Sequence, residues 1–294
     1  MIDQLVRLLD YEFVQNAIAA GFIIAVVCGV VSRFVVARDM SFAVHALAEI
    51  GFTGAAGFVL LRLPPVLGLL TGASLSAIFI GALGVRARGR DNLIGVTLAF
   101  GLGLGVLFIS LYRQYATQAF AILFGTITGV SRNDVLLMIG MGVATLGAVA
   151  LVYRPLTFMT VDPEVAEARG VPVGILGVVF LLIMAVAIVE AVQVVGVLLI
   201  LTLMITPGAA AERLTPQPGR AILYGVVIAL FCTLGGITLA LLINWPVSFF
   251  VTSLSFIVYA VSRVLLGPFL QRRAVRGSET AAEAVTRPKR SMSA

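Results

Sequence analysis

Long apolar runs, separated by short polar breaks, follow one another along nearly the whole chain. Each run has about 20 residues, the length that an α-helix needs to cross the hydrocarbon core of a bilayer. The breaks fall at charges, prolines and turn residues, and the pattern predicts an all-α, polytopic membrane protein with about eight to nine transmembrane helices. The nine predicted spans are 13–32, 42–61, 65–85, 92–111, 135–152, 174–191, 194–211, 221–243 and 247–267.

One apolar piece does not fit this pattern. Residues 118–130 are too few to span a bilayer, and we interpret them as a re-entrant or interfacial helix. If one segment is re-entrant, eight or ten spans are the alternatives to nine.

Composition agrees with a membrane protein and leaves no room for a separate soluble domain. The mean hydropathy is +1.11 and only 12% of the residues are charged, whereas soluble domains carry about 25% charged residues. We therefore expect a single transmembrane domain over 1–270. The tail 271–294 is polar and basic, and we expect it to be disordered on the cytoplasmic side.

Arginines in the breaks orient the predicted spans. With the C-terminal tail in the cytoplasm, the inner breaks and the tail hold Arg33, Arg38, Arg86, Arg88, Arg90, Arg154, Arg169, Arg213, Arg220, Arg272, Arg273, Arg276, Arg287, Lys289 and Arg290. The outer breaks keep only Arg7, Arg62, Arg113 and Arg132. This asymmetry follows the positive-inside rule and predicts nine spans with the N-terminus outside. It also accounts for the pI of about 9.9 through contact with anionic membrane lipid, so we expect no nucleic-acid partner.

The only histidine, His45, lies in the second span with Glu49 four residues later. Residues four apart share a helix face, with Cβ atoms roughly 6 Å apart. A charged group at the centre of a membrane helix costs about 2.5–3.5 kcal/mol on insertion scales, so such a pair points to function. Together with Ser41 and Thr53 the two residues form a polar stripe. An imidazole and a carboxylate suit zinc, manganese or ferrous iron, and the alternative is a structural pair buried between helices.

Glu190 is the other carboxylate within an apolar run, near the predicted outer end of the sixth span, and Gln193 can share its face. Two interpretations stay open: a second contact for a metal ion on its path, or an acid at an interface that water reaches. Cys28 and Cys232 stand in separate apolar runs without neighbouring ligands, and we interpret both as core residues.

The longest polar interruption, 153–173, ends with the signals of a short helix. Asp162 can cap the free amides, Pro163 suits the first helical position, and Glu164 complements the helix dipole. Gly170 can close the helix behind Arg169. The segment can be a connector lying on the membrane surface. The alternative is a docking helix for a cytoplasmic partner, because a polytopic protein without a soluble domain must obtain work from elsewhere if it pumps.

Four stretches together resemble the permease subunits of ABC-type zinc/manganese/iron importers. The segment 153–173 looks like their coupling segment, and RDMSF at 38–42 resembles an "RRMSF" motif that opens their second span. ILFG at 122–125, followed by VS at 130–131, is similar to their "LFG…VS" segment. The span 194–210 is similar to their "VGxLL…PAATA" span. The four lie in the family's order, and the match runs from about residue 13 to 267.

The resemblance implies a function and partners that composition does not reveal. It implies a multi-pass permease in the cell membrane of a prokaryote that imports a divalent transition-metal ion, zinc or manganese, with iron as a further candidate. It implies a dimer of permease subunits, two ATP-binding subunits that push on 153–173, and an extracytoplasmic metal-binding protein. The metal is cargo, and no permanently bound cofactor is expected. We identify no residues for ATP hydrolysis, which we assign to the separate ATPase subunit.

The metal-ligand stripe departs from the family pattern. The family usually has Asp at position 45 and His at position 49, so here the order is reversed and Glu replaces Asp. Two alternatives to metal-ion import stay open: an ABC permease for a metal chelate such as haem, a siderophore or cobalamin, and an ion-coupled secondary carrier that uses the pair as a relay. An intramembrane metalloprotease is disfavoured, because one histidine cannot build H-E-x-x-H.

Overall fold

The computed structural model describes residues 11–83, 90–111, 129–243 and 245–266, and within these ranges it contains helices and no strand. The long helices are α2 (Glu12–Ala37), α3 (Ser41–Leu60), α4 (Pro65–Leu83), α5 (Arg90–Leu111), α7 (Arg132–Val161), α9 (Val173–Val195), α10 (Val197–Leu214), α11 (Pro218–Ile243) and α12 (Val247–Val261). A short helix, α8 (Pro163–Ala168), stands between α7 and α9, and a π-helical turn, Ser262–Leu266, follows α12. Each of the nine predicted spans coincides with one long helix.

Eight of these helices are long and apolar enough to cross a membrane, within the described ranges. The long helix outside these eight is α10, which corresponds to the seventh predicted span; it has 18 residues and follows α9 after a single residue, Gly196. Gly196 has φ of +81°, a left-handed conformation that glycine adopts without steric cost. Pro207 does not end α10, because the helix continues through that proline to Leu214.

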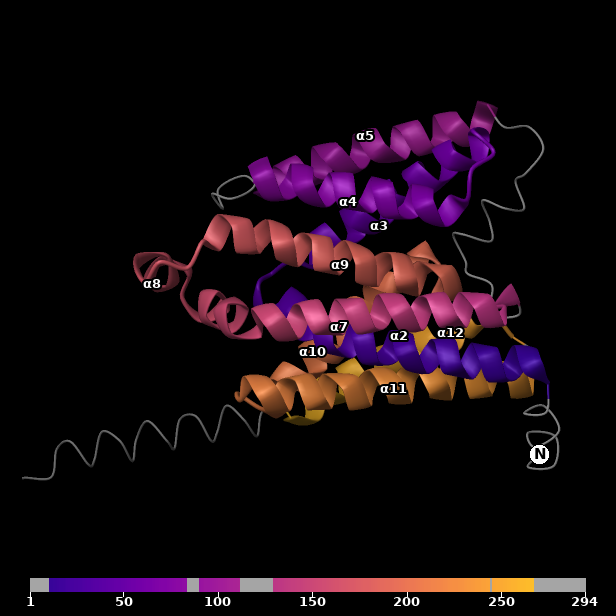
Figure 1. The fold of residues 1–294 in the computed structure, drawn as a ribbon. Coiled ribbons are helices and arrows are strands. Elements are labelled where there is room, and N and C mark those ends of the chain that lie inside the picture. The colour runs from indigo at the N-terminus through magenta and orange to yellow at the C-terminus, as the bar shows by residue number, and fades with distance from the viewer. Residues whose placement is uncertain (1–10, 84–89, 112–128, 244, 267–294) are drawn as a thin grey trace, which may run out of the picture.

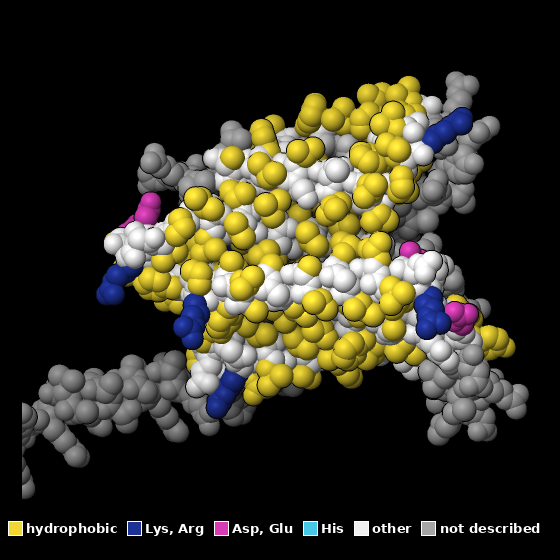
Figure 2. Space-filling view, in the orientation of Figure 1, with side chains coloured by type: hydrophobic (Ala, Val, Ile, Leu, Met, Phe, Trp, Pro, Cys, Tyr) yellow, Lys and Arg dark blue, Asp and Glu magenta, His cyan; other side chains and the backbone are white. Residues whose placement is uncertain are grey.

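The long helices run side by side and alternate in direction (Figure 1). The start of α2 lies at the opposite end of the bundle from α8 and from the end of α12, as an odd number of crossings requires. On the face seen in Figure 2, charged side chains gather at the two ends and apolar side chains cover the middle. This is the surface of a helix bundle surrounded by lipid. We call the end with α8 cytoplasmic, following the distribution of arginines.

Helices α2, α3 and α9 form the centre of the bundle, whereas α5 and α12 lie at its edge. In the most apolar stretch of α9, 67% of the residues are buried, but the figure is 17% for α5. Helix α9 packs against α4, α7, α2 and α3. A side chain on α9 can therefore face any of several helices, and its direction decides which residues it can contact.

Glycines bring α3 and its neighbours into backbone contact. A Cβ atom added at Gly54 of α3 or at Gly68 of α4 would collide with the backbone of the other helix, and one at Gly72 would lie 2.6 Å from the Ile50 carbonyl oxygen. Gly68 and Gly72 form the G-x-x-x-G spacing typical of closely packed membrane helices. The backbones of α3 and α4 are thus held too tightly for a larger residue at these positions.

Two of the three glycines in the run at Gly101, Gly103 and Gly105 of α5 serve helix packing. Gly101 lies against Ile50 and Gly105 against Thr53, whereas Gly103 faces open space.

The fifth predicted span ends too early. Helix α7 does not stop at residue 152 but continues through Pro155 to Val161. Proline within a helix removes one hydrogen bond and costs about 3 kcal/mol. Burial of Leu156 and Met159 in the core offsets that cost. The first half of the segment 153–173 is therefore helix rather than a polar loop.

Several sequence predictions fall outside the described residues. They are the disordered tail 271–294, the motif residues 122–125 and nearly all of the predicted re-entrant piece 118–130. These stay predictions, as does the boundary of the single domain 1–270.

Candidate metal-binding and coupling sites

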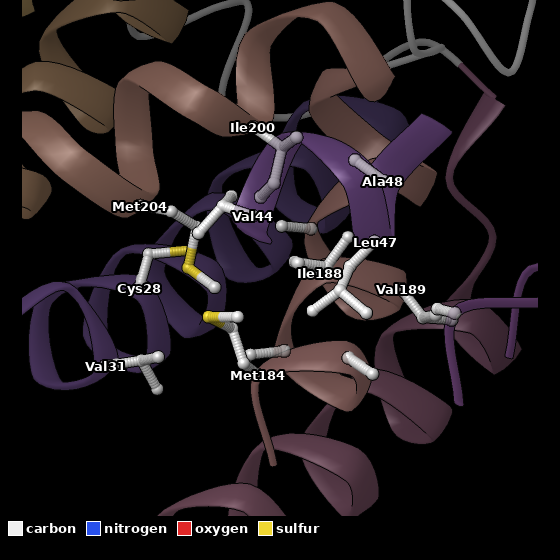
Figure 3. Close-up of a cluster of buried hydrophobic side chains, with 14 of the residues drawn as sticks. Cys28, Val31, Val44, Leu47, Ala48, Met184, Ile188, Val189, Ile200 and Met204 are labelled. Atoms are coloured by element: carbon white, nitrogen blue, oxygen red, sulfur yellow. The ribbon is translucent and has the colours of Figure 1, made fainter. Parts of the chain in front are cut away.

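The predicted ligand pair lies at the beginning of α3 but inside the bundle. Figure 3 shows Val44 and Leu47 of α3 in one buried cluster with Cys28 of α2 and Ile188 of α9. Cys28 stands nine residues before the end of α2, which is roughly 14 Å along a helix. The first turns of α3 therefore share a buried cluster with the middle of α2, so the pair is nearer the membrane interior than the helix position alone suggests.

His45 and Glu49 share the remaining face of α3. Gly51 and Gly54 meet α4, while Ile50 and Thr53 meet α5. The ligand pair lies between the α5 contacts and the core contacts of the helix. Glu49 is 7% exposed, and His45 is half-buried and within electrostatic reach of Glu49. The stripe thus presents one imidazole and one carboxylate at a position that the chain covers only in part.

Thr53 has a structural role at the outer end of the stripe. Its hydroxyl oxygen lies 2.7 Å from the Gly101 carbonyl oxygen of α5 and 3.1 Å from the Glu49 carbonyl oxygen of its own helix. The single hydroxyl proton can be donated to either. Ser41, at the other end of the stripe, is half-buried in the first turn of α3. The pair at 45 and 49 is therefore the part of the stripe that remains available to a ligand.

Glu190 does not join the pair. A Cβ added at Gly142 of α7 would lie 3.0 Å from Glu190 Oε1 and 3.1 Å from a methyl group of Ile23 in α2. Ile188, two residues earlier on α9, is in the cluster on the α3 side. The carboxylate therefore faces α7 and α2, away from His45. In the described part of the chain, no three His, Cys, Asp or Glu side chains gather in a possible metal site.

The surroundings of Glu190 are closed and apolar. Its side chain is fully buried, and neither carboxylate oxygen has a hydrogen-bond partner among the described residues. The Gln193 side-chain amide does not donate to Glu190 but to the Val189 carbonyl oxygen of the same helix, at 3.4 Å. An interface reached by water, one of the two predicted settings for Glu190, does not match this burial.

Helix α8 has the capping that the sequence predicts. The Asp162 side chain accepts a hydrogen bond of 3.0 Å from the Val165 amide, and Pro163 occupies the first turn. Gly170 follows the helix with φ of +85°. Glu164 and Arg169 are exposed. These two charged side chains are therefore free to meet a partner at the cytoplasmic end of the bundle.

Only one residue of α8 anchors the helix in the bundle. Ala166 is fully buried, and its carbonyl oxygen accepts a hydrogen bond of 3.0 Å from the Val171 amide. The helix touches both α7 and α9. A load on α8 would thus pass directly into the ends of two transmembrane helices.

Sequence reasoning missed two contacts at the same end of the bundle. Arg33 of α2 forms an ion pair with Glu212 of α10. The Arg38 guanidinium carbon lies 5.1 Å from the ring centroid of Phe180 in α9. The charges and the ring could be found in the sequence. However, nothing in the spacing indicates which of the many arginines and phenylalanines meet.

Comparisons with known proteins agree on one family. The model of the ABC 3 transport family matches residues 10–265. The manganese transport system membrane protein MntC of Halalkalibacterium halodurans is 30% identical over 229 residues, which cover 76% of this chain and 78% of that protein. The manganese import system permease protein ScaB of Streptococcus gordonii is 32% identical over 213 residues, covering 72% of this chain and 76% of that protein.

Two solved structures share the fold. A chain of PsaBC from Streptococcus pneumoniae, solved in complex with Fab, matches with a TM-score of 0.81 and 26% identity over 90% of this chain and 95% of that chain. A putative metal-chelate type ABC transporter in an inward-facing conformation matches with a TM-score of 0.66 over 89% of each chain, and at 14% identity it shows the fold alone. The chain is a multi-pass protein of the prokaryotic cell membrane, and it belongs to the ABC 3 transport family, whose permease subunits its four motifs resemble.

Proposed function

We propose that the chain is the permease subunit of an ATP-driven importer of a divalent transition-metal ion, with manganese as the first candidate and zinc as the second. One observation carries this proposal: an imidazole and a carboxylate lie four residues apart on a partly covered face of α3, within the interior of the bundle. The manganese transport proteins among the relatives support the choice of cargo. Iron remains a further candidate, since all three ions accept this ligand pair.

Two ligands are too few to hold the ion, and a second copy of the chain would complete the set. Zinc usually takes four ligands, and manganese prefers more oxygen. Two copies with their α3 faces toward one pathway would supply His45 and Glu49 twice. His45 is half-buried in the single chain, which leaves it accessible to such an arrangement. We therefore propose a dimer in which the ion passes between the two α3 helices.

The energy for transport would come through α8. We propose that two ATP-binding subunits dock on the exposed charges Glu164 and Arg169, on a helix shaped by Asp162, Pro163 and Gly170. Import also needs delivery, which we assign to an extracytoplasmic metal-binding protein at the opposite end of the bundle. In this arrangement the chain itself conducts the ion and hydrolyses no ATP.

The geometry favours a bare ion over the two alternatives. A bulky chelate needs a wide path and gains nothing from an imidazole and a carboxylate on one helix. A secondary carrier would need no cytoplasmic docking helix, whereas α8 has an N-cap and two exposed charges that suit a docking role.

Competition for uptake tests the function. The transporter is assembled with its ATPase subunit and binding protein in proteoliposomes, and ATP-dependent uptake of radioactive manganese is measured. We expect an excess of zinc or ferrous iron to inhibit uptake and magnesium to have little effect, because magnesium sheds its water reluctantly. The proposal fails if no free metal ion enters while a metal chelate does, or if the permease transports without its ATPase.

Glu190 is a separate part of the proposal. Its buried oxygens lack hydrogen-bond partners among the described residues, so an ion that passes between α2, α7 and α9 would find one carboxylate there. We propose a transient contact at Glu190, distinct from the site at His45 and Glu49.

Replacing Glu190 is expected to stabilise the protein and slow transport. A buried polar group without a partner costs about 1–3 kcal/mol in mutational data, so Glu190→Leu should raise the free energy of unfolding by about that amount. It should also lower the maximal uptake rate several-fold. Unfolding can be followed through Trp245, the single tryptophan. Gln193→Leu is the control, since it removes a polar group on the same helix that already has a partner. Unchanged uptake in Glu190→Leu would reduce Glu190 to a structural residue.

A further inference from the structure

The turn between α2 and α3 is rigid. Asp39 has φ of +51°, the Asp39 amide donates to the Val36 carbonyl oxygen at 3.0 Å, and the Met40 amide donates to the Val35 carbonyl oxygen at 2.9 Å. These two bonds around a left-handed residue are those of a Schellman motif at a helix C-terminus. Because α3 begins at Ser41, any displacement of Arg38 must be passed on to the first turn of α3.

Arg38 fastens this turn to α9. Its guanidinium carbon lies 5.1 Å from the ring centroid of Phe180, within the range of a cation–π interaction. A Cβ added at Gly177, one turn earlier on α9, would lie 3.9 Å from Arg38 Nη2. The guanidinium therefore lies along the surface of α9, over both positions. Phe180 is fully buried, so its ring cannot swing away from the arginine.

Phe34 extends the contact to α7. Its ring centroid lies 6.1 Å from that of Phe180 and 6.1 Å from that of Tyr153, both in edge-on geometry. Three rings, one each from α2, α7 and α9, are thus in contact near the α2–α3 turn. Phe180 lies seven residues after the start of α9 and Tyr153 eight residues before the end of α7, which is about two helical turns in each case. Helix α7 ends just before α8, and α9 begins just after it.

We infer that Arg38 and Phe180 are positioning residues that transmit displacement of α8 to the ligand pair on α3. The inference rests on the proposed function, in which the ATPase acts on α8 and the ion contacts His45 and Glu49. A load on α8 moves the adjoining ends of α7 and α9. The rings of Tyr153 and Phe180 then shift Phe34, and the guanidinium carries the α2–α3 turn along with α9. His45 follows Arg38 by seven residues, so its imidazole moves with that turn.

A second arginine–aromatic contact serves as the control that distinguishes transmission of movement from α8 to α3 from ordinary packing. Arg213 of α10 lies over Tyr259 of α12, with its guanidinium carbon 5.9 Å from the ring centroid. This is the same kind of contact at the same end of the bundle, and neither residue adjoins α8 or the α2–α3 turn. Loss of the Arg38 contact should therefore uncouple transport, and loss of the Arg213 contact should not.

The test measures ions imported per ATP hydrolysed by the complete transporter in proteoliposomes. In Arg38→Ala and Phe180→Leu this ratio is expected to fall about tenfold, a size typical of coupling between two sites, with ATP hydrolysis within about twofold of wild type. Phe180→Trp, which keeps an aromatic face for the cation, should restore coupling. Arg213→Ala should behave as wild type. A wild-type ratio in Arg38→Ala overturns the inference, as does an equal loss in Arg213→Ala.

A cysteine reporter tests the movement without relying on metal transport. Cys28 and Cys232 are the only cysteines and both are buried, so in Ser41→Cys the new thiol, at a half-buried position in the first turn of α3, is the most exposed one. Its rate of modification by a water-soluble maleimide should change when the ATPase is trapped with vanadate. We expect this change to disappear in Arg38→Ala, or in Arg38→Gln, which also removes the cation, if the alanine variant does not accumulate. If wild type imports no metal but the reporter responds, the proposed cargo fails and the link stands. If the reporter responds equally in both chains, the link fails.

Discussion

Replacing His45 or Glu49 by alanine is expected to abolish metal uptake while the chain still accumulates in the membrane. Each change removes one of the two ligand types from the α3 face, and in the proposed dimer it removes two ligands at once. Even residues that only hold a metal ligand in place contribute about 10–100-fold to affinity or activity. Loss of the ligand itself should therefore lower uptake by at least about a hundredfold. The measurement is ATP-dependent uptake of radioactive manganese and zinc in proteoliposomes.

Two further variants distinguish ligand chemistry from helix packing. The exchange His45→Glu with Glu49→His keeps one imidazole and one carboxylate on the same face of α3, in the order that the family resemblance predicts. We expect it to keep transport that either alanine variant loses, with a changed preference between manganese and zinc. Thr53→Val removes a hydroxyl that contacts Gly101 and should affect stability without affecting metal preference. Uptake near the wild-type level in both alanine variants would contradict the assigned site.

The spans could be predicted because the bilayer imposes a strict rule on each of them. Backbone amides and carbonyls have no water to bond within the hydrocarbon region, so an apolar run of sufficient length must be helical. The rule holds even for α10, which is separated from α9 by Gly196 alone. The bilayer rule does not determine how far a helix continues beyond the hydrocarbon region. Helix α7 accordingly continues beyond the predicted boundary, through Pro155 to Val161, because Leu156 and Met159 are buried in the core.

Helix α8 was predictable for a different reason. Its boundaries are set by local chemistry, since the Asp162 side chain bonds an amide three residues later and Gly170 adopts positive φ. Such interactions involve neighbouring residues and leave a direct signature in the sequence.

The direction of a side chain inside the bundle left no such signature. Helix α9 is apolar on all sides, so the pattern could not show that Glu190 faces Gly142 of α7 rather than the ligand pair. Nor could hydropathy show that the start of α3 shares a buried cluster with the middle of α2, because that depends on a turn closed by two backbone hydrogen bonds. The sequence identified the residue types of the candidate site, and the fold decided which of them share a face.

Removing the charges of α8 is expected to uncouple the ATPase from transport. Glu164→Ala with Arg169→Ala should lower metal uptake at least about tenfold and abolish stimulation of ATP hydrolysis by the loaded binding protein, the size expected for loss of coupling between sites. Both side chains are exposed, so their removal leaves the packing of α7 and α9 intact. Arg154→Ala is the matched control, since Arg154 is also exposed at this end of the bundle but lies on α7.

The shape of α8 can be tested apart from its charges. Asp162→Ala removes the N-cap, which is typically worth about 1 kcal/mol, and Gly170→Val forces a β-branched residue into a left-handed conformation. Both changes act on the helix before any ATPase binds, so they should weaken association with the ATPase subunit, measured by co-purification. The charge variant, by contrast, keeps the helix and loses only its contacts. If all these variants associate with the ATPase and transport as wild type does, α8 is a connector lying on the membrane surface, and the ATPase must act elsewhere on the chain.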